Sequence, residues 1–304
     1  MPRVLLHGLR LAAVDIDGVL LNDTFSPVIH RLAEQHQVAY TPELERAVFS
    51  RPRLEAARVF LDAAGSVQDP REVIDAYFRE RERYLTTHPV HVMPGAPALL
   101  HRLRGLGLDV VCYGGLDHRH FRRHLGAWAS YFTGPRYICT DAFRPGIEEI
   151  TRDVFGLDHG QVLFIDDVAS VAERARDLGA AFIGRPASFA HGFQRRLMRE
   201  AGVRYLADCL DDIDETMLHA VARESAAGTL WHTTNTTSTN TNPTNTSPTT
   251  PAPGPAAGAA PVTAAGPTSP VTAAVPTSAA AAGAVTAPAA PAVGPALSGR
   301  QVLS

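Results

Sequence analysis

The sequence contains no lysine, so every side chain with a fixed positive charge is an arginine. It also has no run of roughly 18 uninterrupted apolar residues, which argues against a membrane-spanning helix. The formal net charge of −3 gives no support for a nucleic-acid or anionic-membrane surface. The N-terminus lacks the small-residue cleavage site of a signal peptide. We therefore expect a cytoplasmic protein without a nucleic-acid or membrane partner.

Cysteine is scarce as well. Cys112, Cys139 and Cys209 are odd in number and widely spaced, without a CxxC pair. This pattern does not fit a disulfide framework or a zinc site, and we expect three reduced thiols. Cys112 lies within an apolar run, so a buried small hydrophobe is the expected role for it.

Charge is missing from the C-terminal part of the chain. No Asp, Glu, Lys or Arg lies between Glu224 and Arg300, and this segment is rich first in Thr and Asn and then in Ala, Pro and Gly. With few large apolar groups, it cannot bury enough surface to offset the entropy lost on ordering. We predict that residues 226–304 form a disordered tail. A dispensable tail is the simpler interpretation, and secretion, glycosylation or partner docking is the alternative.

The rest of the chain contains short apolar runs, rich in Val and Ile, that are typical of buried strands. The runs are residues 11–16, 109–113, 137–140, 162–165 and 181–183, with 203–206 as a weaker candidate. Amphipathic helical patterns separate most of them. Strands that alternate with helices imply a mostly parallel sheet covered on both faces, which is a Rossmann-like α/β core.

A long insertion separates the first two predicted strands. Residues 22–92 contain four helical patterns and no strand pattern. Thr41 and Asp69 each precede a proline, which is typical of an N-cap followed by proline at the first helical position. The predicted organisation is therefore an α/β core, residues 1–21 and 93–225, with an all-helical cap subdomain over residues 22–92.

Carboxylates follow two of the predicted strands. Asp15 and Asp17 follow the first, and Asp166 and Asp167 follow the fourth. The carboxyl ends of parallel strands meet at one edge of the sheet, where open α/β sheets hold their ligands. Four carboxylates near one point repel one another unless a divalent cation neutralises them. Hard oxygen ligands of this kind select Mg²⁺, which is the predicted cofactor.

Two other strand ends carry polar or glycine residues. Gly114 and Gly115 follow the second predicted strand, and Asp141 and Arg144 follow the third. Taken alone, a Gly-Gly pair is most often a turn and an Arg-Pro pair most often lies on the surface. Together with the carboxylates, they favour a site at this edge.

These motifs, D-I-D-G-V-L and I-D-D-V-A at strand ends with a helical insertion between them, resemble the haloacid dehalogenase (HAD) superfamily of phosphohydrolases. The resemblance spans about residues 8–225 and includes a cap of the type inserted after the first motif (C1). It is to the branch that contains phosphatases, phosphoglycolate phosphatases and β-phosphoglucomutases. It implies a HAD-like hydrolase that cleaves phosphoric monoesters.

The resemblance also implies a role for each carboxylate. Asp15 would be the nucleophile that forms an aspartyl-phosphate, and Asp17 the general acid and then the general base. Mg²⁺ would be held by the Asp15 carboxylate, the Asp17 main-chain carbonyl and Asp167, with Asp166 as a direct or indirect ligand. An aspartate at Asp17 favours phosphate-ester hydrolysis or phosphoryl transfer over dehalogenation or phosphonate cleavage.

The sequence departs from the family pattern at the phosphate-binding motifs. The second motif normally ends in Ser or Thr, but Tyr113, Gly114 and Gly115 stand there, and the two glycine N–H groups are the remaining phosphate donors. The third motif normally supplies a lysine, and Arg144 occupies its place. A smaller departure is Val171, where the fourth motif often continues with Asp or Asn.

Two further sets of residues are candidates for the site. Arg51, in a cap segment that resembles the loop and helix facing the active site in sugar-phosphate members, is the candidate leaving-group contact, and a solvated surface arginine is the alternative. His118 and His120 follow the Gly-Gly turn. We expect them on a helix surface.

The leading hypothesis is a Mg²⁺-dependent phosphatase that acts on a small phosphorylated metabolite, as a monomer or homodimer. One alternative is a phosphomutase of the same fold, in which the phosphate returns to a sugar. Another is a catalytically weak homologue that binds a phosphorylated ligand or partner, because the hydroxyl of the second motif and the lysine of the third are missing.

Overall fold

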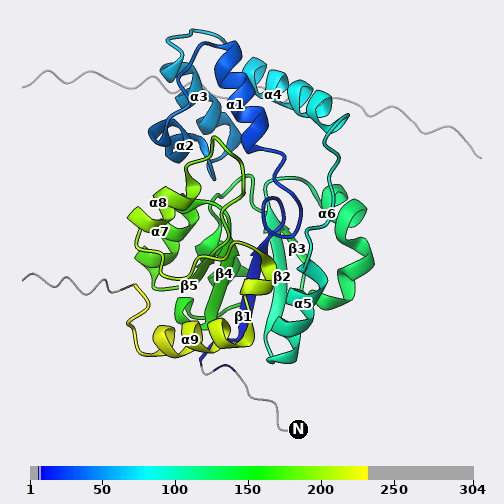
Figure 1. Cartoon of the computed structure of the whole chain (residues 1–304), viewed down its shortest axis with the longest axis vertical. Coiled ribbons are helices and arrows are strands. Elements are labelled where there is room, and N and C mark those ends of the chain that lie inside the picture. Colours follow the sequence, from blue (N-terminus) through cyan, green and yellow to red (C-terminus); the bar gives the residue numbers. More distant parts are fainter. Residues whose placement is uncertain (1–5, 7, 232–304) are drawn as a thin grey trace, which may run out of the picture. The chain divides into compact units, whose positions relative to one another are not determined.

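The computed structural model describes residue 6 and residues 8–231 (Figure 1). Nearly all of the predicted tail lies outside these residues. In the part of the chain that the structure describes, no helix is long and apolar enough to cross a membrane.

The core is a five-stranded parallel sheet with the strand order β3-β2-β1-β4-β5. The strands are β1 (Leu11–Asp15), β2 (Asp109–Gly114), β3 (Tyr137–Cys139), β4 (Val162–Asp166) and β5 (Ala181–Gly184). The five main strand predictions are confirmed to within one residue at each end. The weaker candidate, residues 203–206, forms only an isolated bridge between Leu206 and Gly184.

The central strand β1 is buried on both faces. Alternate residues point to opposite sides of a strand, and β1 places Ala12 and Val14 in one apolar cluster and Leu11 and Ala13 in another. A strand that is buried on both faces needs an unbroken apolar run, which is what the sequence provides. The same continuous burial carries Asp15, the last residue of β1, into the interior.

Helices cover both faces of the sheet, as predicted (Figure 1). The α-helices of the core are α5 (Ala96–Gly105), α6 (His118–Leu125), α7 (Ala169–Leu178), α8 (Gln194–Glu200) and α9 (Glu215–Ala226). Side chains of α5, α6 and α9 pack on one face, and those of α7 and α8 on the other. Shorter turns complete the core: the 3₁₀ segments η1 (Gly126–Tyr131), η3 (His159–Gln161) and η4 (Leu210–Asp212), and the π-helix η2 (Glu149–Val154).

The packed part of the chain extends beyond the predicted boundary at residue 225. Leu230 is buried, and the indole Nε1 of Trp231 donates a hydrogen bond to the Ala180 carbonyl at 3.0 Å. Two large apolar side chains at the start of an otherwise uncharged and weakly apolar segment are enough to hold it on the core. The rest of the predicted tail, residues 232–304, lies outside the described residues.

The insertion between β1 and β2 is helical, as predicted. It contains α1 (Ser26–Gln35), α2 (Pro42–Val48), α3 (Arg53–Ala63) and α4 (Pro70–Leu85), which share an apolar cluster of their own. Both predicted N-caps are confirmed: Thr41 Oγ1 accepts from the Leu44 N–H at 3.2 Å, and Asp69 Oδ1 from the Arg71 N–H at 2.9 Å. The cap and the core belong to one compact unit, and the exact domain boundaries stay a prediction.

Helix α2 attaches the cap to the core through a buried carboxylate. Both oxygens of Glu45 accept from the Phe193 N–H at the start of α8, at 3.0 and 2.9 Å. Ser170 Oγ donates to the Phe49 carbonyl at 3.2 Å beside it. Glu45 makes no ion pair with the residues that the structure describes, and burial raises its pKa. The attachment therefore holds a carboxylate that is costly to ionise.

We expect Glu45→Gln to change how stability depends on pH. Because the folded pKa of Glu45 is raised, the protonated carboxyl stabilises the fold at low pH, and this contribution is lost as the pH rises through the folded pKa. The free energy of unfolding of the wild type, relative to Glu45→Gln, should therefore fall as the pH rises above about 4.3, the ordinary pKa of a glutamate. Urea unfolding at several pH values measures this difference.

The control is Glu43→Gln on the same helix. Glu43 is exposed, and hydrogen bonds at the start of the helix lower its pKa, so wild-type stability relative to this variant should not fall as the pH rises. If the difference in free energy of unfolding between the wild type and Glu45→Gln did not change with pH, the pKa of Glu45 would not be raised by folding.

Candidate active site

Three of the predicted carboxylates converge at the carboxyl edge of the sheet. Asp15 ends β1 and Asp166 ends the neighbouring strand β4, and Asp167 follows directly. All three are buried, with 2–6% of their surface exposed. Parallel pairing of β1 with β4 puts these side chains at the same edge, as the sequence predicts.

The glycine after the first motif is needed for this convergence. Gly18 has a φ of +100°, a conformation that other residues rarely adopt. A Cβ at this position would lie 2.0 Å from Asp167 Oδ2. The loop after β1 can therefore approach the second carboxylate motif only with glycine at position 18.

The clustered carboxylates are under electrostatic strain. Burial raises the pKa of Asp15, and the negative charges of Asp166 and Asp167 raise it further, while the Arg144 guanidinium acts in the opposite direction. Burial also raises the pKa of Asp166 and of Asp167. The protein groups at the site thus leave negative charge that is not fully compensated.

The carboxylates are suited to Mg²⁺, although their present arrangement is not that of a formed metal site. Among residues 6 and 8–231, no three His, Cys, Asp or Glu side chains converge as metal ligands do. Both oxygens of Asp166 accept protein hydrogen bonds, Oδ2 from the Tyr113 hydroxyl and Oδ1 from the Val168 N–H at 2.7 Å. Asp15, Asp167 and the Asp17 carbonyl are the hard oxygen donors that fit Mg²⁺, with Asp166 behind them.

The end of β2 explains why the second motif has no hydroxyl. A Cβ at Gly114 would lie 2.4 Å from Ile16 Cγ2, and one at Gly115 would lie 3.2 Å from Arg144 Cζ. A serine or threonine at either position would have to displace one of these neighbours. The Arg144 guanidinium thus lies directly against the backbone where the family pattern places a hydroxyl.

Asp17 has a partner that sequence analysis placed elsewhere. His120 Nε2 lies 2.8 Å from Asp17 Oδ1, and the two side chains are only 10% and 7% exposed. The expectation that His120 lies on a helix surface is therefore wrong, whereas His118 is exposed as expected. His120 reaches the site because α6 begins directly after the Gly114–Gly115 turn, so its first turn lies beside the same sheet edge.

Comparison with known proteins agrees with this geometry. No family model matches the sequence. A stretch of 111 residues is 32% identical to (DL)-glycerol-3-phosphatase 1, mitochondrial, of Arabidopsis thaliana, and it spans 35% of this chain and 37% of that protein. The chain thus matches about a third of the length of this curated relative.

Solved structures match over most of the described residues. A phosphonoacetaldehyde hydrolase like protein from Oleispira antarctica has a TM-score of 0.55 at 16% identity, over 74% of this chain and 96% of that chain. A β-phosphoglucomutase from Clostridium difficile has a TM-score of 0.52 at 12% identity, over 72% and 99%. The chain has the haloacid dehalogenase fold. The predicted fold is confirmed.

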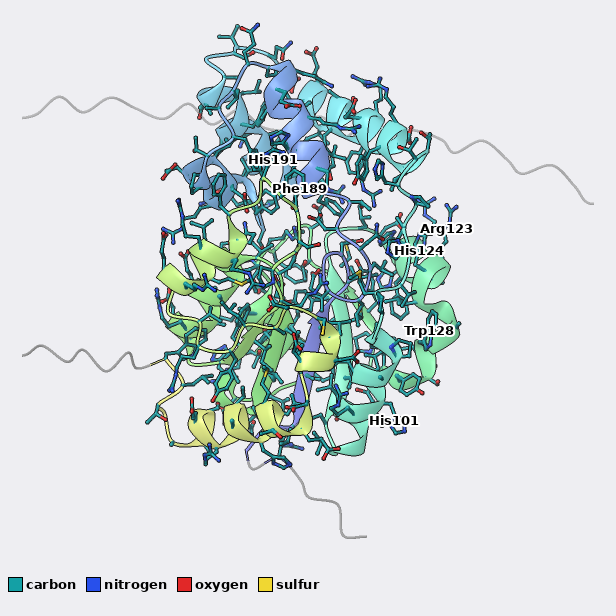
Figure 2. All side chains as sticks on the ribbon, in the orientation of Figure 1. His101, Arg123, His124, Trp128, Phe189 and His191 are labelled. Carbon is teal, nitrogen blue, oxygen red and sulfur yellow. The ribbon has the colours of Figure 1, made fainter. Side chains whose placement is uncertain are left out.

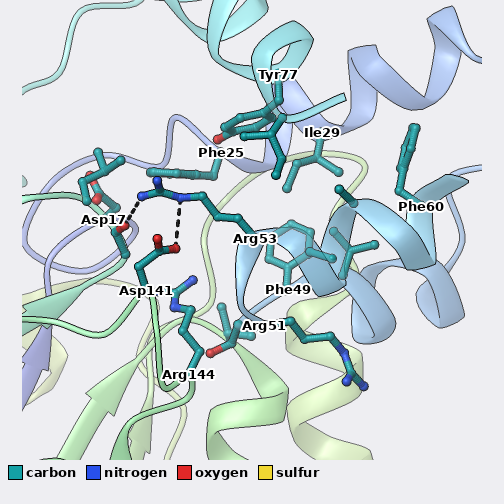
Figure 3. Close-up of a pocket in the computed structure, with 18 of the residues that line it drawn as sticks. Asp17, Phe25, Ile29, Phe49, Arg51, Arg53, Phe60, Tyr77, Asp141 and Arg144 are labelled. Atoms are coloured by element: carbon teal, nitrogen blue, oxygen red, sulfur yellow. Dashed lines mark hydrogen bonds and ion pairs between the residues drawn. The ribbon is translucent and has the colours of Figure 1, made fainter. Parts of the chain in front are cut away.

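The helical insertion of this HAD fold sends a different arginine to the site from the one predicted. Arg51 lines the pocket, but its Nη1 pairs with Glu55 Oε1 at 2.6 Å and points away from the carboxylates (Figure 3). Its role at the leaving group stays a prediction. Arg53 instead donates from Nη2 to the Gly115 carbonyl and pairs through Nε with Asp141 Oδ1 at 3.0 Å.

Sequence analysis missed Arg53 because both arginines flank the same proline, in R-P-R. The signal that could have identified Arg53 is its position as the first residue of α3. This end of the helix faces the core of the HAD fold. Arg53 therefore bridges the cap to the second and third motifs, and it is the cap cation in contact with the strand-edge residues.

We expect Gly18→Ala to destabilise the protein more than the same change at Gly179. Both glycines have positive φ, but a Cβ at Gly179 meets nothing within 4 Å. Gly179→Ala should cost about 1–2 kcal/mol from backbone strain. Gly18→Ala should cost about 1–3 kcal/mol more, because Asp167 must move. Urea unfolding measures both, and equal costs would contradict the close approach of Gly18 to Asp167.

Proposed function

We propose that this protein is a Mg²⁺-dependent phosphohydrolase that removes phosphate from a small phosphorylated metabolite. The observation that carries the proposal is the buried convergence of Asp15, Asp166 and Asp167 beside a Gly-Gly turn with Arg144 against it. The glycerol-3-phosphatase similarity supports the same reaction class. The fold alone does not choose between the reactions that it hosts, so the site residues carry the argument.

The phosphate is bound by the end of β2 and by Arg144. Gly115 lines the pocket, and its N–H is the candidate donor for a phosphoryl oxygen, while Gly114 ends β2 outside the lining and its donor role stays a prediction. The planar Arg144 guanidinium beside Gly115 adds donors with a fixed charge. Mg²⁺, when bound by Asp15, Asp167 and the Asp17 carbonyl, supplies the positive charge that lets a carboxylate approach a phosphate dianion. In this arrangement, the glycine N–H donors replace the missing hydroxyl, and Arg144 replaces the missing lysine.

The reaction proceeds in two displacements. An Asp15 carboxylate oxygen attacks phosphorus, the bond from phosphorus to the alcohol oxygen breaks, and Asp17 protonates the leaving oxygen. Asp17 then takes a proton from water, whose oxygen attacks the phosphoaspartate and releases inorganic phosphate. The bond between phosphorus and Asp15 breaks in this step, so the enzyme returns to its initial state.

His120 holds the proton-transfer group in place. Its hydrogen bond to Asp17 Oδ1 leaves the other oxygen of the same carboxyl for the leaving group. Misplacing a group in proton transfer reduces the rate strongly, because the transfer needs a short and well-aligned contact. His120 is therefore a positioning residue for Asp17.

Location in the cytoplasm and a monomeric or dimeric state belong to the same proposal. The three cysteines are unpaired, and Cys112 is buried as expected, which supports a reducing compartment. The near-neutral charge supports a small-molecule substrate in preference to nucleic acid or a membrane surface.

The first test is phosphate release by the full chain from a panel of phosphate esters, with Mg²⁺ and with EDTA. We expect turnover that EDTA abolishes. Asp15→Asn should lower kcat by about 10⁴-fold or more, because it removes the nucleophile. Circular dichroism of the variant should show an intact fold.

Each other outcome of this test overturns the proposal. Full turnover by Asp15→Asn would exclude an aspartyl-phosphate. Isomer conversion that depends on a sugar bisphosphate, in place of phosphate release, would identify a phosphomutase. Tight ester binding without turnover would identify a binding homologue.

A second prediction separates the role of His120 from a general loss of structure. His120→Ala should lower kcat about 10- to 100-fold for alkyl phosphates, whose leaving oxygen needs a proton, with KM nearly unchanged. For 4-nitrophenyl phosphate, whose leaving group needs no proton, the loss of kcat/KM should be small. The esters are compared by kcat/KM because it reports the first displacement alone, whereas the second displacement needs Asp17 as a base for every ester. His118→Ala, an exposed histidine on the same helix, is the matched control. An equal loss for both kinds of ester would argue against action through Asp17.

A further inference from the structure

The pocket that contains the carboxylates continues into the cap, and its walls there are apolar. The cap lining includes Phe25, Ile29, Phe49, Ala56, Phe60 and Phe78. These side chains come from or lie beside all four cap helices, and Figure 3 shows Phe25, Ile29, Phe49 and Phe60 among those that line the pocket. The whole pocket, from the carboxylates to the cap, has a volume of 170 Å³, against about 150 Å³ for a cavity that accommodates benzene, so its cap end alone has room for a small hydrocarbon body.

Of the three charged cap residues in the lining, the two arginines are directed away or already paired. Arg51 pairs with Glu55, and Arg53 bonds to the core and lies over the Phe78 ring at 5.1 Å. The third charged residue, Asp23, accepts through Oδ1 from the Phe25 and Ser26 N–H groups, and its buried Oδ2 has no partner among the described residues.

Apart from the arginines, only Asp23, Ser50 and Tyr77 among the described residues offer polar side chains on the cap side of the pocket. A substrate with many hydroxyl groups would therefore lose more water contacts here than it gains partners, which is costly for each buried hydroxyl left unpaired. The cap end of the pocket therefore disfavours the body of a sugar.

One hydroxyl in the pocket does lack a partner. The Tyr77 hydroxyl, on α4, is buried and has no hydrogen-bond partner among the described residues, and it is drawn facing into the pocket in Figure 3. A buried polar group without a partner is destabilising. A ligand that offers one polar atom at this point would remove the cost, whereas a ligand with several would leave others unsatisfied.

We propose that the substrate is a phosphate monoester of a largely apolar alcohol, either aromatic or a short alkyl chain. This inference rests on the proposed phosphatase function and adds its substrate class. The phosphate lies at Gly115 and Arg144, and the hydrocarbon body fills the cap cavity beside Phe49, Ala56 and Phe60. The Tyr77 hydroxyl bonds to a single polar atom of the body or of the ester.

The test compares kcat/KM for n-alkyl phosphates from methyl to hexyl, for phenyl phosphate, and for glycerol 3-phosphate and glucose 6-phosphate. We expect kcat/KM to rise roughly fourfold or more with each methylene until the cavity is full. Phenyl phosphate should exceed both polar esters at least tenfold. A preference for glycerol 3-phosphate or glucose 6-phosphate would overturn the inference and leave the phosphatase proposal standing.

A pair of variants on α3 tests where the body binds. Ala56 lines the cavity, whereas Ala63 is exposed on the same helix and outside the lining. Ala56→Leu should lower kcat/KM for phenyl and hexyl phosphate at least tenfold and leave methyl phosphate unchanged. Ala63→Leu should change none of the three. Equal effects of the two variants would contradict the assignment of the cavity to the substrate body.

Binding of phenylphosphonate, measured by calorimetry with the full chain, separates the two proposals. We expect it to bind at least tenfold more tightly than inorganic phosphate, and Ala56→Leu to abolish this preference. If no ester is hydrolysed but the preference is present, the phosphatase proposal fails and the ligand class stands. If neither turnover nor preference is found, both fail.

Discussion

The repulsion between buried carboxylates is the constraint on which the rest of this site depends. Asp15 and Asp166 end two paired central strands, where neither can move away without disrupting the sheet. Burial raises the pKa of both, the charges of Asp166 and Asp167 raise that of Asp15 further, and Arg144 offsets only part of the effect. In the proposed reaction, a bound cation would relieve this repulsion, once the carboxylates move from their present arrangement into a ligating one.

The departures from the family pattern follow from one packing arrangement. A chain without lysine must place arginine at the third motif, and a guanidinium is wider and planar where an ammonium is compact. Arg144 lies against Gly115, and a Cβ at Gly115 would come into tight contact with the guanidinium. Gly114 is held to glycine by Ile16 in the same way. The missing hydroxyl thus follows from packing against Ile16 at Gly114 and against Arg144 at Gly115, and it does not by itself indicate an inactive site.

Features that depend on the backbone could be predicted from the sequence, and features that depend on side-chain reach could not. Apolar runs fixed the five strands, and because parallel strands end at one edge, the positions of Asp15 and Asp167 followed. His120 and Arg53 were missed because their roles depend on where a helix starts relative to the sheet edge. The hydrophobic periodicity of the sequence does not predict that position. Trp231 was missed since a single indole contact can hold a segment whose average composition predicts no packing.

The apolar interior of the cap lies between the contacts that attach the cap to the core, and in our proposal it also selects the substrate. Glu45 and Arg53 hold it against the core from two sides, so the pocket between them has a defined shape. Ala57 and Phe60 belong both to the hydrophobic cluster of the cap and to the pocket lining. An apolar group bound there would extend the cap's own core, because it contacts the side chains that hold the four helices together. A polar body would gain little from the same walls, where few polar atoms are free to pair with it. In the proposed function, the residues at the strand ends of the α/β core carry out the reaction. The apolar interior of the cap, which a bound group would complete, selects the substrate.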